Sequence, residues 1–371
     1  MEPSGATKPP TIYDVAKHAG VSIASVSRVL NGDHTRQATR EKVLAAVQEL
    51  GFVPDGSARG LSKGSKQIVG LVFARTPAED ALMGVEERSL LFTDSVIRGA
   101  ESSAHHLGYS LLMSGAGAAE DGVVGTTAAI AALTGKVDGL ILLDRVLPEQ
   151  KVAPFAKRFP IVLLAGSGRS RSAVTVRVDN AGAMHAMADH LVHKHGLRRM
   201  AFVSGFVDSP DSSTRAEALA SALSELGGTC EPLDEWSADF TSTGALNMMR
   251  RQLATGAALP QAIVCANDQM AIGVLHALTG AGYAVPEDVA VVGFDDIPVA
   301  SHMSPPLTTV RQPSRQLGAA AVEAVVSLVE GRASDRDVVL PTELIVRASC
   351  GCGSRTSRPG IDAEARLVPV A

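Results

Sequence analysis

Two kinds of hydrophobic pattern divide this chain of 371 residues. Up to about residue 52, apolar residues recur at i, i+3, i+4 and i+7, a spacing that predicts short amphipathic helices. From residue 68 to about residue 348, short runs rich in Val, Ile and Leu alternate with amphipathic stretches. This alternation predicts parallel strands joined by crossover helices. The runs are Ile68–Phe73, Tyr109–Met113, Gly139–Leu143, Ile161–Ala165, Met200–Ser204, Ala262–Ala266 and Val289–Phe294.

The pattern also predicts how the chain is organised. Residues 9–53 are expected to form a helical unit, and residues 54–66, rich in Gly, Ser and basic side chains, a linker. Residues 67–349 are expected to form an α/β core. A pattern of about 280 residues is long for one sheet, which favours two subdomains. Residues 350–371 show no periodicity and are predicted to be disordered.

The segment Thr11–Asn31 carries signals for the start and the end of helices. Thr11 and Asp14 have the spacing of a capping box, and Gly20 suits the left-handed turn that ends a helix. Ser22 is placed to cap a second helix. The inward-facing residues of that helix are predicted to be Val26, Val29 and Leu30.

The outer face of the second helix carries small side chains and one arginine. Two short helices joined by a glycine turn, with such a face, are typical of a helix-turn-helix that reads DNA. Arg28 suits a bidentate contact with guanine, whereas Ile23 and Ala24 suit thymine methyl groups. Serines near the positive helix N-terminus suit phosphate contacts, and these are Ser22, Ser25 and Ser27. The alternative is a plain helical hairpin with a solvated outer face.

A third helix is predicted over residues 36–50, ending at Gly51. Its inward-facing side chains are predicted to be Val43, Leu44, Val47 and Leu50. Its exposed basic side chains either contact phosphates or form a solvated face.

Charge separates the segments. Residues 8–66 contain nine Lys and Arg and five Asp and Glu, a net charge of +4 in a chain of net charge −5. A basic small segment joined to an acidic large one favours a nucleic-acid-binding module. No apolar run approaches the roughly 18–20 residues that span a bilayer, and residues 1–10 lack the apolar core of a secretory signal. The protein is therefore expected to be cytoplasmic, with no membrane partner.

The cysteines and histidines predict no metal site and no cofactor. Cys230 and Cys265 stand alone, and one residue separates Cys350 from Cys352, which is too few for the usual zinc spacing. All four are expected to be free thiols without function. Four histidines on or near one helix lack the i, i+4 spacing of a metal site and are expected to be solvated: His185, His190, His193 and His195. The sequence contains no nucleophile elbow, Walker loop or Gly-x-Gly-x-x-Gly motif, so an enzyme is not expected.

Short motifs occur at both ends of the chain and between them. The N-terminal ones are Tyr13-Asp-Val-Ala, Ala19-Gly-Val-Ser, Val26-Ser-Arg-Val-Leu-Asn31, Thr39-Arg-Glu-Lys-Val43 and Phe52-Val-Pro54. The later ones are Val176-Arg-Val-Asp-Asn180, Ala266-Asn-Asp-Gln-Met-Ala271, Gly293-Phe-Asp-Asp296 and Pro306-Leu-Thr-Thr-Val-Arg-Gln312. In this combination the chain resembles the lactose-repressor (LacI/GalR) family of transcription regulators over nearly its whole length.

The resemblance implies that residues 54–66 form a hinge helix that folds on DNA. In the family a Leu of this hinge enters the minor groove, and Leu61 occupies that position here. Gly56 and Gly60 depart from the family pattern, and each costs roughly 1 kcal/mol in a helix. The predicted DNA-binding residues are Thr11, Tyr13, Ser22, Ile23, Ala24, Ser25, Ser27, Arg28, Asn31, His34, Ala58, Arg59 and Leu61.

The resemblance also implies a core like the periplasmic sugar-binding fold, with a ligand between two subdomains at the carboxyl ends of parallel strands. The first subdomain is expected at about residues 67–177 and 312–340, and the second at about 178–311 and 341–349. The chain is expected to cross between them near Val176–Asp179, Thr309–Gln312 and Leu340–Pro341.

The predicted effector-binding residues are Phe92, Thr93, Arg215, Phe240, Asn267, Asp295 and Gln312. Donating arginine and amide groups, an accepting carboxylate and aromatic faces together suit a sugar. The alternative for Asn and Asp after a strand is to cap the next helix, which is the interpretation for Asp268 and Asp296. Residues 165–167 are Ala, Gly and Ser where many relatives have a polar ligand contact, so the effector is expected to differ from common family sugars.

The sequence thus predicts a homodimeric repressor with an N-terminal all-α helix-turn-helix domain and an α/β periplasmic-binding-protein-like core. It is expected to bind a pseudo-palindromic operator in double-stranded DNA, with an affinity controlled by a sugar or sugar derivative. A transcriptional activator of the same family uses the same parts. The alternative from another class is a solute-binding transport component, which the N-terminal helices and the absent signal peptide oppose.

Overall fold

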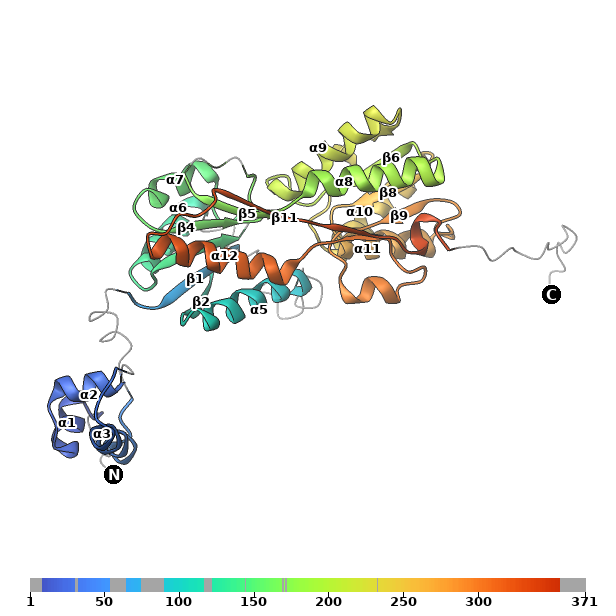
Figure 1. Ribbon diagram of the computed structural model, residues 1–371. Helices are drawn as coiled ribbons and strands as arrows, with labels where there is room; N and C mark the ends of the chain where they lie inside the picture. The colour runs from blue at the N-terminus through green and yellow to red at the C-terminus, as the bar shows by residue number, and fades with distance from the viewer. Residues whose placement is uncertain are drawn as a thin grey trace, which may run out of the picture. The chain divides into compact units, whose positions relative to one another are not determined.

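The computed structural model describes residues 9–30, 33–53, 65–74, 90–116, 122–143, 145–168, 170, 172–231 and 233–353. The chain divides into two compact units, residues 1–68 and 69–371 (Figure 1). The predicted linker from residue 54 to residue 64 lies outside the described residues, as do residues 354–371. Among the described helices, none is long and apolar enough to cross a membrane.

Three helices make up the described part of the smaller unit: α1 (Ile12–Ala19), α2 (Ile23–Leu30) and α3 (Gln37–Leu50). The carboxylate of Asp14 accepts hydrogen bonds from the backbone N–H and the hydroxyl of Thr11, at 2.8 and 2.7 Å. Gly20 has φ +63° at the end of α1, and the Ser22 hydroxyl accepts from the backbone N–H of Ser25 at 3.2 Å. The predicted cap and turn signals are confirmed.

The core of the smaller unit brings together the apolar stripes of the three helices. Its buried members are Val15, Ala16, Val26, Val29, Val43 and Ala46. The prediction for Leu44 is wrong, because this side chain is 47% exposed while Ala46 is buried. Positions 43, 46, 47 and 50 follow the helical spacing of i, i+3, i+4 and i+7, whereas position 44 lies about 100° around the helix from position 43.

The larger unit contains a six-stranded sheet in the order β11-β5-β4-β3-β1-β2. Its strands are β1 (Ile68–Ala74), β2 (Ser110–Ala116), β3 (Gly139–Leu143), β4 (Ile161–Leu164), β5 (Val174–Val178) and β11 (Asp337–Leu340). The pairs β1 with β3, β3 with β4, β4 with β5 and β5 with β11 are parallel. The four strands that were predicted here from their apolar runs are therefore confirmed.

A second sheet has four strands in the order β7-β6-β8-β9, all paired in parallel. These are β6 (Arg199–Val203), β7 (Thr229–Cys230), β8 (Ala262–Cys265) and β9 (Ala290–Val292). Strands β10 (Thr309–Arg311) and β12 (Glu343–Ile345) form a small antiparallel pair. Each of them stands next to a point where the chain passes from one large sheet to the other. β10 also runs beside the end of β9 through the bridges Val292 to Thr308 and Asp295 to Arg311.

Helices of the larger unit pack in pairs, α5 against α12, α8 against α9, and α10 against α11 (Figure 1). Their bounds, with α6 and α7, are α5 (Leu90–His106), α6 (Gly122–Thr134), α7 (Glu149–Ala156), α8 (Asn180–Asp189), α9 (Pro210–Glu225), α10 (Ser242–Ala254), α11 (Asp268–Gly280) and α12 (Ser314–Val329). The described residues also form the shorter helical turns η2 (His190–Lys194), η3 (Leu233–Trp236), η4 (Pro298–His302) and η5 (Ala348–Cys350).

The chain passes between the two large sheets after β5, between β10 and α12, and between β11 and β12 (Figure 1). A helix-turn-helix unit and a core of two subdomains with parallel sheets are the predicted fold class, which is confirmed. Beyond the predicted core boundary at residue 349, residues 350–353 are ordered, and Cys350 is 2% exposed.

The crossing of α5 and α12 depends on two glycines. A Cβ atom on Gly318 would fall well inside van der Waals contact with the backbone of Val96, and one on Gly99 would do the same against Arg315. Neither neighbour is a flexible side chain that can turn away. The two helix backbones therefore lie closer together than any other residue type allows.

Gly318→Ala is expected to destabilise the larger unit by about 1–3 kcal/mol, because the added methyl forces the two helices apart. Gly280→Ala is the matched control, since Gly280 ends α11 and has no atom near its Cβ position. Urea unfolding followed by circular dichroism measures both. Equal unfolding midpoints for the two variants would contradict the close crossing.

Candidate functional site

The outer face of α2 is exposed as predicted. Ile23 is 42% exposed, and Ser22, Ala24 and Arg28 are exposed as well. Ser25 and Ser27 are half-buried. The face thus consists of small side chains, one branched apolar group and one guanidinium, and only the guanidinium offers several hydrogen-bond donors.

The other predicted DNA-binding residues surround this face or lie outside the described part. Tyr13 is 68% exposed and His34 is exposed, whereas Thr11 is half-buried and bonded to Asp14. Four of them lie outside the described residues: Asn31, Ala58, Arg59 and Leu61.

In the larger unit, Arg215 is the centre of a buried polar network. Its side chain is carried by α9, which begins after the Ser209 cap, and the residue is 3% exposed. Its Nε donates to Asn180 Oδ1 at 2.8 Å, and its Nη1 donates to the carbonyl of Ala266 at 2.6 Å. The guanidinium carbon lies 3.5 Å from the ring centroid of Phe294. One side chain thereby joins the start of α8 to the carboxyl ends of β8 and β9.

Two half-buried carboxyl groups interact with the positive charge of Arg215. Asp211, one turn earlier on α9, approaches it at 3.6 Å and accepts from Asn180 Nδ2 at 2.7 Å. Burial raises the pKa of Asp211, and Arg215 opposes that rise. Burial also raises the pKa of Asp295 to about 7, opposed by Arg215 and by the hydrogen bond from Gln312. Asp295 therefore changes its charge near neutral pH.

Asp295 and Gln312 come together through the β9–β10 pairing. Asp295 follows β9 in the left-handed region, with φ +122°, and its Oδ1 accepts from Gln312 Nε2 at 2.5 Å. Both line a cavity of about 540 Å³, together with Phe92 of α5. Three of the seven predicted effector-binding residues therefore lie around one cavity. Thr93 is half-buried next to Phe92 and is not in that lining.

Asn267 and Phe240 form a second small group. Asn267 is 3% exposed, caps α11 by accepting from Met270 N at 2.9 Å, and donates to the carbonyl of Phe240 at 3.1 Å. The helix-capping alternative thus applies to Asn267. Phe240 has φ +63°, and its ring lies 5.8 Å from that of Phe206.

The capping interpretation of Asp268 and Asp296 is wrong. Asp268 is fully buried and accepts from the backbone N–H of Ile297 at 2.9 Å and from the Thr309 hydroxyl at 2.5 Å. Asp296 accepts from Arg311 at 2.7 Å and from Arg347 at 2.6 Å. These carboxylates bind Thr309 and Arg311 of β10 and Arg347 near the end of the core. Because these partners are distant in the sequence, no local pattern predicts the bonds.

A further group was missed by the sequence reasoning. Arg145 follows β3, and its guanidinium carbon lies 3.7 Å from the ring centroid of Phe206. It forms an ion pair with Asp208 at 2.6 Å, and both line a cavity of about 210 Å³. Gly166 and Ser167, in the segment that lacks the family's polar residue, line the same cavity. For the Arg215 network, the i, i+4 spacing of Asp211 and Arg215 was an available signal.

The expectation of solvated histidines is wrong at two positions, His190 and His195, whereas all four cysteines are free thiols, as predicted. His190 and His195 are half-buried, and their Nε2 atoms lie 3.7 and 3.2 Å from the Sγ of Cys352. Cys350 Sγ lies 3.5 Å from His190 Nε2. His185 and His193 are exposed, as predicted.

Asp295→Asn is expected to remove a pH dependence from the stability of the core. The folded-state pKa of about 7 lies above the ordinary value of 3.8, so the folded chain binds an extra proton between these values. Stability from this carboxyl is therefore present below about pH 4 and is lost as the pH rises to about 7. The free energy of unfolding of the wild type, relative to that of Asp295→Asn, should be lower at pH 8 than at pH 4.5 by on the order of 2–4 kcal/mol.

Urea unfolding of both proteins at the two pH values measures this difference. Asp335→Asn, which removes one exposed carboxylate, is the control. A wild-type to Asp295→Asn difference that is the same at both pH values would contradict the raised pKa of Asp295.

Two family models match the two parts of the chain. The model of the lacI family of bacterial regulatory proteins matches residues 11–55, and that of the periplasmic binding protein-like domain matches residues 188–350. The chain is 30% identical over 319 residues to the ribose operon repressor of Escherichia coli strain K12. The aligned region covers 85% of this chain and 92% of that protein.

Solved structures agree with these matches. The lac repressor dimer bound to operator and the anti-inducer ONPF superposes with a TM-score of 0.78 at 29% identity, covering 92% of this chain and 99% of that one. The complex of the transcriptional regulator CelR with cellobiose superposes with a TM-score of 0.65 at 30% identity, with the same coverage of 92% and 99%. By its sequence and its fold, this chain belongs to the lacI family of bacterial regulatory proteins.

Proposed function

We propose that this DNA-binding transcription regulator is a homodimeric repressor whose affinity for its operator is controlled by a sugar or sugar derivative bound in the core. The observation that carries the proposal is a cavity of about 540 Å³ that Phe92, Asp295 and Gln312 line, with Asp295 also interacting with the buried Arg215. The same chain carries the exposed helix α2. A relative named ribose operon repressor and a relative solved with cellobiose support a carbohydrate.

In this proposal α2 enters the major groove. Arg28 binds guanine through its two Nη groups, Ile23 and Ala24 contact thymine methyls, and the serines bind phosphates. Two copies of α2 in a dimer read two half-sites of a pseudo-palindrome. The hinge residues Ala58, Arg59 and Leu61, which lie outside the described residues, contact the minor groove between the half-sites.

The proposed effector lies at the carboxyl ends of strands from both sheets. Arg215 donates to hydroxyl groups, Asp295 accepts from them, and Gln312 orients Asp295. Phe92 supplies an apolar face for sugar C–H groups, with Phe240 as a second face. Asn267 has its amide engaged with Phe240 and its oxygen with α11, so we assign it a supporting role.

In this proposal, the effector can control DNA binding because the residues that contact it lie in both halves of the core. Phe92 lies on α5 of the first half, whereas Arg215 and Asp295 lie in the second half, and Gln312 lies at a crossing. A ligand that contacts all of them more favourably in one arrangement of the halves shifts the population toward that arrangement. The size of the regulatory effect equals the difference in affinity between the two arrangements.

Arg28→Ala is expected to weaken specific DNA binding by about 5- to 150-fold, which corresponds to about 1–3 kcal/mol for a bidentate guanine contact. The probe is a duplex selected from a random pool by the full-length protein, and fluorescence anisotropy at fixed salt measures its binding. Arg158→Ala, an exposed arginine of the core, is the control for lost charge. Non-specific binding to an unrelated duplex should change little. Unchanged specific affinity would show that α2 does not read bases through Arg28.

Arg215→Lys is expected to keep specific DNA binding and to lose the response to effector by at least about tenfold, because lysine lacks the fork of donors. The effector is first found as the sugar or nucleoside that raises the melting temperature of the wild type. Arg199→Lys is the matched control, since Arg199 of β6 pairs with Glu231 at 3.0 Å and is not part of the Arg215 network. A normal response in folded Arg215→Lys protein would place the effector elsewhere.

A further inference from the structure

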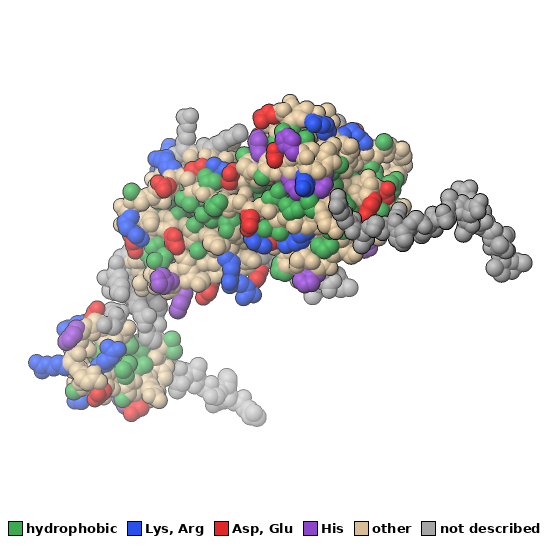
Figure 2. Space-filling model, turned by 45° about the vertical axis from the view of Figure 1, so that its right-hand side comes forward, with side chains coloured by type: hydrophobic (Ala, Val, Ile, Leu, Met, Phe, Trp, Pro, Cys, Tyr) green, Lys and Arg blue, Asp and Glu red, His purple; other side chains and the backbone are tan. Residues whose placement is uncertain are grey.

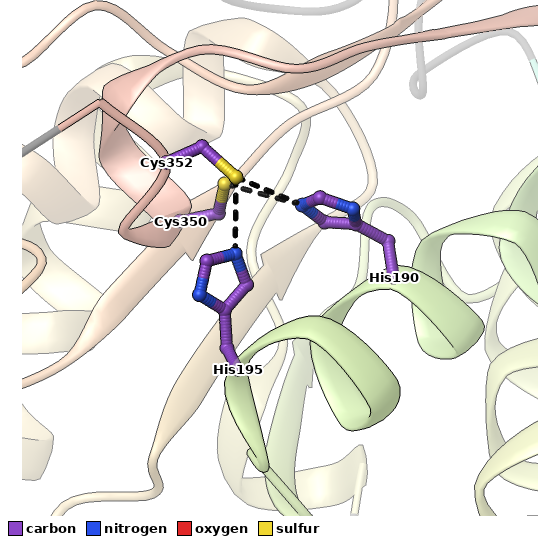
Figure 3. Close-up of side chains that lie close together, drawn as sticks. All are labelled: His190, His195, Cys350 and Cys352. Atoms are coloured by element: carbon purple, nitrogen blue, oxygen red, sulfur yellow. Dashed lines mark hydrogen bonds between the residues drawn. The ribbon is translucent and has the colours of Figure 1, made fainter.

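Four side chains that bind soft metals meet on the larger unit. His190 and His195 come from the end of α8 and η2, and Cys350 and Cys352 come from the end of the described chain (Figure 3). One ligand atom from each residue lies within 4.8 Å of all the others. Figure 3 shows the imidazoles and thiols pointing toward one another, and Figure 2 shows histidine side chains gathered on this part of the surface. None of these four residues lines the cavity of about 540 Å³ described above.

A π turn brings the two histidines together. Residues five apart on an α-helix lie about 140° apart around its axis, which would point His190 and His195 in different directions. Helix α8 passes into the π-helical turn η2, which has i to i+5 hydrogen bonds and so places residues five apart nearly above one another. Their rings are 5.1 Å apart between centroids and meet edge to face. Such turns are rare and occur frequently at functional sites.

The residue between the two cysteines is a glycine that the arrangement requires. Gly351 has φ +105°, a conformation that other residues rarely adopt, and a Cβ at this position would lie 3.1 Å from Nδ1 of His195. The turn lets both thiols face the histidines although only one residue separates them. The single residue between Cys350 and Cys352 is fewer than zinc-binding cysteine pairs usually have, but this turn still lets both thiols reach one metal ion.

Three of the six separations between ligand atoms are close to those of tetrahedral coordination, and all six are within 4.8 Å. Zn–S bonds of about 2.3 Å and Zn–N bonds of about 2.0 Å at tetrahedral angles separate the ligand atoms by about 3.3–3.8 Å. The three recorded separations between sulfur and imidazole nitrogen are 3.2, 3.5 and 3.7 Å. Two thiolates with two imidazoles are a common donor set of structural zinc sites.

We propose that His190, His195, Cys350 and Cys352 form a structural zinc site that fastens the end of the core to helix α8. Four protein ligands leave no open position for water or substrate, so the site is structural rather than catalytic. The two histidines are separated from the two cysteines by 155 to 162 residues along the chain, so the metal closes a long loop.

The surroundings of the site support metal binding. The hydroxyl of Thr308, a fully buried residue, donates to Cys350 Sγ at 3.1 Å, and such a bond orients a ligating sulfur.

Metal content tests the proposal directly. The full-length protein is produced without a histidine tag, incubated with excess zinc chloride in the presence of a phosphine reductant, dialysed and measured by inductively coupled plasma mass spectrometry. We expect about one zinc per chain in the wild type, and less than about a tenth of that in Cys352→Ser and in His195→Asn, because three ligands rarely retain structural zinc. His193→Asn and Cys230→Ser are the matched controls and should keep the wild-type content, since His193 is exposed and Cys230 lies on β7.

Cobalt provides a readout that does not depend on folding alone. Cobalt chloride added to the metal-free wild type should give thiolate-to-cobalt charge-transfer absorption, which Cys352→Ser should lose while its circular dichroism stays that of the wild type. Chelator should lower the melting temperature of the wild type and of His193→Asn but leave that of Cys352→Ser unchanged.

Three outcomes would overturn the proposal. The first is a wild type that holds no zinc after this incubation. The second is a double variant, His195→Asn with Cys352→Ser, that holds as much zinc as the wild type. The third is a disulfide between Cys350 and Cys352, found by mass spectrometry of protein alkylated anaerobically in the presence of the reductant.

Discussion

A guanidinium group that cannot lose its proton is buried at the carboxyl ends of two strands, and the architecture of the core depends on neutralising it. Arg215 is 3% exposed, and an unpaired charge in such a place is strongly destabilising. Asn180, the Ala266 carbonyl and two carboxyl groups satisfy it, and they come from α8, β8, α9 and the end of β9. Because the pKa of Asp295 is about 7, one of these partners adjusts its charge near neutrality.

Local signals in the sequence were sufficient for the helical unit and for most strands. The bond between Thr11 and Asp14 and the left-handed Gly20 involve neighbours in the chain, so composition and spacing reveal them. The buried strands show as continuous apolar runs because both faces are covered. Leu44 was misplaced because several apolar residues stand next to one another on α3, and only packing against α1 and α2 decides which of them turn inward.

The site was partly predictable, and the rest depended on contacts distant in sequence. Asp295 and Gln312 follow β9 and β10, and Arg215 lies on the helix after β6, all near the end of a parallel sheet where ligands usually bind. Asp268 and Asp296 stand at equivalent places, yet bind Thr309 and Arg347, partners that no spacing reveals. The His190 and His195 pair was discounted on α-helical geometry, and only a π turn makes five residues the right interval. Sequence periodicity identifies the regular element, and a local departure from it is visible only in the structure.

The central claim is that a ligand held by Arg215 and Asp295 touches both halves of the core and so sets DNA affinity. A crystal structure of the protein with the small molecule that stabilises it most would test this claim directly. The account predicts ligand oxygens within hydrogen-bonding distance of Arg215 and Asp295, with Phe92 against an apolar face of the ligand. A ligand bound to one half alone, with the Arg215 network untouched, would contradict it.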